Sequence, residues 1–135
     1  MLLNINPLLT GELLKQLDEM GHSDYLVIAD ANFPAHRLDP HTLEYPATTV
    51  SQIAAAVCEV LPLDAELAPV LMESGRTPAP VVQDEILAAV GHASSARLVA
   101  RSAYYDLAAG ASVVVSTGEL RLWANVILYK GLVTR

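Results

Sequence analysis

Short, almost wholly apolar runs alternate with helix-like segments along this chain, and this alternation restricts the possible folds most strongly. Tyr25–Ala29 and Ala111–Thr117 contain no charged residue. Such runs are typical of strands buried on both faces of a sheet, because half-exposed strands alternate apolar and polar residues. Strands separated by helices predict a mostly parallel sheet. The expected fold class is therefore α/β, a three-layer sandwich with a mostly parallel central sheet.

Local signals place the individual elements. Thr10 is expected to cap a first helix that Gly21 ends, and three prolines indicate a long loop over Asp30–Pro46. Further helices are predicted at 51–61, 81–90 and 102–109, and further strands at 67–72, 97–99 and 126–129.

Size and charge narrow the class of protein. A chain of 135 residues fits one domain, 1–135. With 53% hydrophobic residues, an excess of apolar surface has to be buried, and subunit interfaces are the natural place for it. The net charge of −7 leaves no basic face for nucleic acid. No apolar run is long enough to cross a membrane, and the N-terminus lacks an export signal, so we expect a cytoplasmic protein.

Candidate chemistry lies in the loops, because open α/β sheets bind ligands beyond the carboxyl ends of their strands. Asp30–His36 and Thr117–Glu119 follow strands, and Gly21–Asp24 precedes one. The chain has no GxGxxG, GxxxxGK[ST], HExxH or GxSxG motif. These absences disfavour a nucleotide cofactor, a phosphorylated substrate, a bound metal and a serine nucleophile.

Five segments, in the same order, match the pattern of one family. Gly21–Asp24 and Asp30–His36 flank the first strand as in GHxD–strand–DAxFPAH, and Arg101–Asp106 is similar to RFxFYE. Thr117–Glu119 is similar to TGE, and Asn125–Gly131 to the NIIL-KG ending. The chain thus resembles the RbsD/FucU family of sugar mutarotases over nearly its whole length.

This resemblance implies an RbsD-like fold and an enzyme that interconverts the anomers of a free, unphosphorylated monosaccharide without a cofactor or metal. Asn32–His36 and Arg101 are similar to the L-fucose mutarotase branch, so L-fucose is the expected substrate. The alternatives are a D-ribose pyranase-type interconversion of pyranose and furanose, or a monosaccharide-binding sensor that has lost its proton relay. Family members form rings, commonly decamers, with active sites at subunit boundaries.

The resemblance also assigns roles to single residues. His22 matches the family histidine and is expected to be catalytic, since imidazole both gives and takes protons near neutrality; otherwise it ends the first helix. Asp30 is expected to bind sugar hydroxyls, or else to cap its own turn. Arg101 is expected to donate to hydroxyls, or to form an ion pair between subunits with Glu119 or Asp106.

The remaining candidates for substrate binding are less clear-cut. His36 is either a sugar contact or a solvated surface histidine, and Tyr105 is either a contact or a packing residue. Asn125 matches the binding asparagine of the family. Trp123 departs from the family pattern, which has tyrosine there; its indole can stack on a sugar ring but has no readily titrating proton. The second acid–base group is therefore Asp30 or water, or turnover is reduced.

Overall fold

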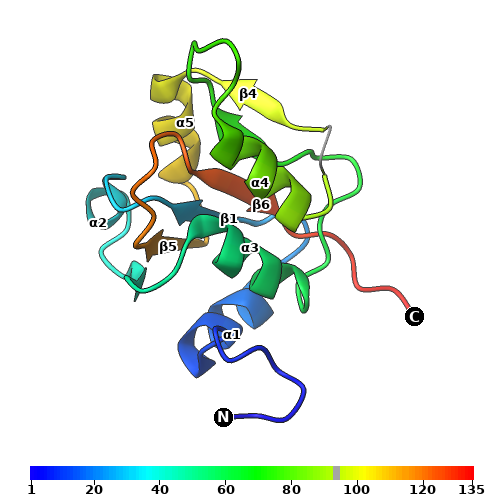
Figure 1. The fold of residues 1–135 in the computed structure, drawn as a ribbon. Coiled ribbons are helices and arrows are strands. Elements are labelled where there is room, and N and C mark those ends of the chain that lie inside the picture. Colours follow the sequence, from blue (N-terminus) through cyan, green and yellow to red (C-terminus); the bar gives the residue numbers. More distant parts are fainter. Residues whose placement is uncertain (93–94) are drawn as a thin grey trace.

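A computed structural model describes residues 1–92 and 95–135 (Figure 1). The helices of this part of the chain are α1 (Gly11–Glu19), α2 (Ala35–Leu38), α3 (Val50–Cys58), α4 (Val81–Ala89) and α5 (Arg101–Ala108). The strands are β1 (Tyr25–Ala29), β2 (Leu43–Tyr45), β3 (Val70–Met72), β4 (Arg97–Val99), β5 (Val113–Thr117) and β6 (Val126–Tyr129). Within the described ranges, no helix has the length and apolar character needed to cross a membrane.

The strands form one six-stranded sheet in the order β2-β5-β1-β6-β3-β4. β6 is antiparallel to both of its neighbours, and the other pairs are parallel. The reason is the short connection between β5 and β6: a parallel return needs a crossover of a dozen or more residues. β6 therefore starts at the edge where β5 ends and runs back between β1 and β3. The predicted mostly parallel sheet is confirmed.

Helices cover both faces of this sheet. Leu26 and Ile28 of β1 belong to a core shared with α1, α3 and α4, whereas Val27 and Ala29 face a second core shared with α5. Figure 1 shows α3 and α4 in front of the sheet and α5 on its other side. The predicted three-layer arrangement is confirmed, and burial on both faces explains why the β1 sequence does not alternate.

Several element ends differ from their predicted positions. Thr10 does cap α1, but the helix ends at Glu19, before Gly21. The predicted strand over 67–72 is shorter in the structure, where β3 begins at Val70. Gly91 follows α4 with a φ of 79°, the left-handed conformation that suits glycine after a helix.

The prediction of a long loop over 30–46 is wrong, because this segment contains α2 and β2. Pro34 precedes α2, and proline is tolerated at the start of a helix. β2 is a three-residue edge strand that pairs with β5, so its existence depends on a partner 72 residues later, Leu43 beside Val115. Proline content alone does not reveal such a long-range pairing.

Gly118 closes the contact between the end of β5 and the segment after β2. A Cβ at this position would lie 1.9 Å from the carbonyl oxygen of Pro46, and a backbone atom cannot rotate away. We expect Gly118→Ala to lower the free energy of unfolding by about 1–3 kcal/mol, as overpacking does. Gly11→Ala is the control, since nothing lies within 4 Å of its Cβ position. Equal denaturation midpoints for the two variants would contradict this packing.

Candidate functional site

The chain directions in the sheet bring the ends of many strands to one edge. β1, β2, β3, β4 and β5 all run the same way, so their carboxyl ends lie together, and β6 begins at that edge. Asp30 follows β1, Arg101 opens α5 just after β4, and Asn125 directly precedes β6. Residues from distant parts of the sequence therefore converge there.

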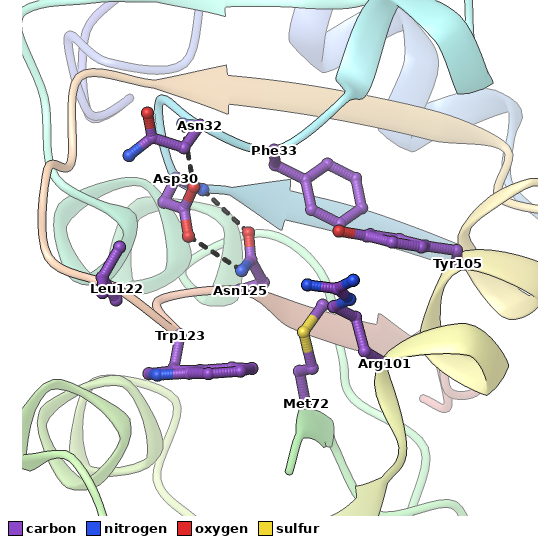
Figure 2. A pocket seen from close by; sticks show the side chains of 9 residues that line it. All are labelled: Asp30, Asn32, Phe33, Met72, Arg101, Tyr105, Leu122, Trp123 and Asn125. Carbon is purple, nitrogen blue, oxygen red and sulfur yellow. Dashed lines mark hydrogen bonds between the residues drawn. The ribbon is translucent and has the colours of Figure 1, made fainter. Parts of the chain in front are cut away.

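A pocket of about 280 Å³ lies at this edge (Figure 2). Its volume is close to the lower end of the range for small-molecule sites, about 300 Å³. The lining combines polar, aromatic and apolar side chains: Asp30, Asn32, Phe33, Met72, Arg101, Tyr105, Leu122, Trp123 and Asn125. Five of the predicted site residues thus share one cavity: Asp30, Arg101, Tyr105, Trp123 and Asn125.

Asp30 and Asn125 form the polar side of the pocket. The Asp30 N–H donates to Asn125 Oδ1 over 2.9 Å, and Asn125 Nδ2 donates to Asp30 Oδ2 over 2.9 Å. The other carboxylate oxygen, Oδ1, accepts a 2.9 Å hydrogen bond from the backbone N–H of Asn32. Both residues are almost fully buried. Burial raises the pKa of Asp30 above its ordinary value, and the negative charge of Glu119 adds to the rise.

The opposite side of the pocket is apolar and aromatic. Trp123 and Met72 lie across from Asp30 in Figure 2. Gln83 of α4 holds both in place, since its Nε2 donates to the carbonyl of Met72 over 2.8 Å and to that of Trp123 over 3.2 Å. Trp123 has a φ of 69°, an unusual conformation for a bulky residue, so this loop is held in a strained shape.

Arg101 and Tyr105 reach the pocket from α5. Figure 2 shows the guanidinium of Arg101 and the hydroxyl of Tyr105 directed toward its interior. Tyr105 packs edge-on against Phe33 with ring centroids 5.5 Å apart, and the Arg37 guanidinium lies 5.9 Å from its ring centroid. Tyr105 is thus both a packing residue and part of the pocket lining.

The segment that carries Trp123 and Asn125 is anchored by a cluster of charges. Glu119 is buried, and its carboxylate accepts from Arg121 Nε over 3.0 Å and from Nη2 over 2.9 Å. These hydrogen bonds lower the pKa of Glu119. Arg121 Nη1 also donates to Glu85 of α4 over 2.7 Å. Glu119 is one of the partners considered for Arg101, but within this chain its carboxylate pairs with Arg121.

His36 lies outside the pocket. It lines a neighbouring cavity and is hydrogen-bonded through Nε2 to Glu44. Both side chains are more than half exposed, which fits the solvated surface histidine considered as its alternative role.

His22 lies at the other edge of the sheet. It precedes β1 while Asp30 follows it, and a five-residue strand separates them by about 17 Å at about 3.3 Å per residue. The His22 imidazole is 51% exposed, and its Nε2 lies 3.0 Å from Oδ2 of Asp64, which is 6% exposed. A single copy of the chain does not bring His22 to the pocket.

Sequence reasoning missed several residues around these two places. Asn32 and Phe33 belong to the matched DAxFPAH segment and were within reach of that signal, and Met72 ends a predicted strand. Gln83 and Asp64 carry no local signal, because each acts on a residue about 40 positions away in the chain. No group of three or more His, Cys, Asp or Glu side chains suited to a metal ion occurs among the residues that the structure describes.

Comparison with known proteins gives matches along almost the whole chain. The model of the RbsD / FucU transport protein family matches residues 3–133. An L-fucose mutarotase of Actinobacillus pleuropneumoniae serotype 5b (strain L20) is 37% identical over 140 residues, covering 98% of this chain and 97% of that protein.

Two solved structures are also similar. FucU from Bifidobacterium longum is 35% identical, with a TM-score of 0.89 and coverage of 96% of this chain and 99% of that one. The fucose mutarotase from Streptococcus pneumoniae, in complex with L-fucose, is 29% identical, with a TM-score of 0.89 and coverage of 98% and 100%.

The Glu119–Arg121–Glu85 cluster predicts unequal losses of stability when Arg121 is removed and when the charge of Glu85 is removed. Arg121→Ala leaves the buried Glu119 carboxylate without its cation, and we expect a loss of about 1–2 kcal/mol in the free energy of unfolding at pH 7. Glu85→Gln removes only an exposed partner and should cost less than about 1 kcal/mol.

The loss in Arg121→Ala should shrink in acid. The Glu119 pKa is lowered in the folded protein, so its stabilising effect is present above the ordinary glutamate pKa and disappears as the pH falls through the lowered value. Urea unfolding at several pH values measures both effects. If the stability lost in Arg121→Ala stays constant down to acidic pH, the pairing of Glu119 with Arg121 does not stabilise the fold as we expect.

Proposed function

The chain belongs to the RbsD/FucU family, and from this we propose that it is a cofactor-free mutarotase that interconverts the anomers of a free monosaccharide, with L-fucose as the preferred substrate. The observation that carries the proposal is the pocket at the carboxyl edge of the sheet. Its buried Asp30–Asn125 pair and its Arg101 offer hydrogen bonds to sugar hydroxyls, and Trp123 and Met72 offer an apolar surface to the C–H face of the ring. The relatives that are L-fucose mutarotases by name support the choice of sugar.

The reaction needs only proton transfers. A base takes the proton of the anomeric hydroxyl while the bond between the anomeric carbon and the ring oxygen breaks, and an acid protonates the ring oxygen. Rotation of the resulting aldehyde and the reverse steps close the ring on the other face. We assign one transfer to His22, and Asp30 or a water molecule to the other, because Trp123 has no readily titrating proton.

His22 has to come from a second copy of the chain. Within one copy it lies at the far end of β1 from the pocket, yet its imidazole is half exposed and can face a neighbour. Exposed leucines lie at both places: Leu122 lines the pocket, and Leu67 and Leu132 line the cavity that contains His22. These surfaces support sites at subunit boundaries. The number of subunits, with a decameric ring as the expectation, and the cytoplasmic location stay predictions.

The activity is measured by saturation-transfer NMR on the anomeric protons of L-fucose, D-ribose, D-galactose and related free sugars. We expect exchange well above the buffer rate, fastest for L-fucose, and its loss in His22→Ala. His41→Ala is the control, because His41 is 94% exposed and does not line the pocket. Faster exchange of D-ribose between its pyranose and furanose forms would favour the pyranase-type alternative, and no enhancement with any sugar would refute the enzyme.

The shared site is tested by subunit complementation. His22→Ala and Asp30→Asn are each expected to be inactive, but a co-expressed 1:1 mixture forms some boundaries with an intact His22 on one copy and an intact Asp30 on the other. Random assembly gives on the order of a quarter of native sites. A mixture as inactive as its parts, beside an active wild type, would place the whole site within one copy.

A second candidate function is a sugar-binding protein without turnover, and Trp123 is the observation that favours it. Calorimetry would then show monosaccharide binding while anomer exchange stays at the buffer rate. In that case Trp123→Tyr, which supplies a titrating hydroxyl, is expected to raise the exchange rate. If wild-type exchange is already fast, this alternative is excluded.

A further inference from the structure

The contact between His22 and Asp64 assigns different roles to the two nitrogens of the imidazole. Nε2 lies 3.0 Å from Oδ2 of Asp64, whereas no hydrogen bond to Nδ1 occurs among the described residues. A carboxylate only accepts hydrogen bonds, so the neutral imidazole carries its proton on Nε2 in this contact. Nδ1 is then left as the basic nitrogen on a side chain that is half exposed.

Asp64 is held rigidly in the form that accepts this bond. Its other oxygen, Oδ1, accepts from the backbone N–H of Glu66 over 2.8 Å and from that of Leu67 over 3.0 Å. These backbone hydrogen bonds, and then the contact with His22, lower the pKa of Asp64, so it stays ionised at neutral pH. The carboxylate is thus fixed on one side by the backbone and presents its second oxygen to the imidazole.

The segments that carry His22 and Asp64 are both hydrogen-bonded to the chain at the carboxyl end of β6. The Asp64 N–H donates to the carbonyl of Tyr129 over 2.9 Å, and the Gly131 N–H donates to that of Pro62 over 2.7 Å. A Cβ on Gly131 would lie 2.5 Å from the carbonyl oxygen of Leu63, so only glycine permits this close approach. On the other side, the N–H of Ser23 donates to the carbonyl of Lys130 over 2.9 Å.

From this arrangement, and resting on the proposed function, we infer that Asp64 is a positioning residue that holds His22 in the Nε2–H tautomer, so that Nδ1 is the atom that takes and returns the sugar proton. Asp24, the acid nearest to His22 in the matched GHxD segment, does not do this. Its Oδ2 accepts from the N–H of Gly21 over 2.7 Å and so shapes the backbone at His22.

Asp64→Asn makes the inference testable, because it should reverse the tautomer without removing a side chain. The N–H groups of Glu66 and Leu67 require an oxygen at the Oδ1 position, so the new amide nitrogen faces His22. An amide N–H donates, and Nε2 then has to accept, which moves the imidazole proton to Nδ1. A proton on Nδ1 blocks its use as a base, and we expect kcat for anomer exchange to fall about 100-fold or more with little change in KM.

The tautomer is read directly by ¹⁵N NMR of histidine-labelled protein, with the pH raised until the ¹⁵N shifts of the imidazoles no longer change. The chain has four histidines, and His22→Gln identifies the His22 signals. The expected wild-type pattern is a protonated Nε2 and an unprotonated Nδ1, and the expected Asp64→Asn pattern is the reverse. Glu66→Gln is the matched control, since it neutralises an acid of the same loop whose carboxylate forms no hydrogen bond to the imidazole among the described residues. It should change neither tautomer nor kcat.

The outcomes separate this inference from the proposed function. Wild-type protein that does not accelerate exchange refutes the function, whatever the tautomer. Protonated Nδ1 in the wild type overturns the inference even if Asp64→Asn fails to fold. Reversal of the tautomer with unchanged kcat would show that Nδ1 is not the proton carrier. An equal loss of kcat in Glu66→Gln would show a general effect of charge. Either result also overturns the inference.

Discussion

The reciprocal hydrogen bonds between Asp30 and Asn125 join two strand ends that are 95 residues apart in the sequence. They are possible because β6 runs back between β1 and β3 and so begins where β1 ends. The pocket is built outward from this pair: Asn32 and Phe33 follow Asp30, and Trp123 precedes Asn125 by two residues. Burying a carboxylate is costly, and the hydrogen bonds from Asn125 and Asn32 offset that cost.

The same mostly parallel sheet that assembles the pocket also separates the two groups to which proton transfer is assigned. Residues before and after one strand lie at opposite edges, so His22 and Asp30 cannot meet within one copy. Each nevertheless has its own support: Asp64 holds the imidazole at one edge, and the Arg121 cluster holds the pocket loop at the other. Exposed leucines lie at both edges, and the proposed subunit contacts would bury them together with part of the apolar excess of the chain.

Local reasoning succeeded where the cause was local and failed where it was not. β1 was predicted with its observed bounds because an apolar run between turn residues depends only on neighbouring residues. β2 was missed because three residues form a strand only through pairing with β5. Asp24 is the acid nearest to His22 in the sequence, but the residue that contacts the imidazole is Asp64, 42 positions away.

By itself, then, the sequence determined the α/β layering, the location of the polar residues at strand ends, and the family resemblance. The reason is that both the burial pattern and the order of the motifs depend on residues that are neighbours in the sequence. Tertiary structure alone decided which polar residues share a cavity. Asp30, Arg101, Tyr105, Trp123 and Asn125 meet there, while His22 and His36 lie elsewhere. The physical reason is that strand direction and strand order set the distance between residues, and both follow from long-range pairing rather than from any local segment.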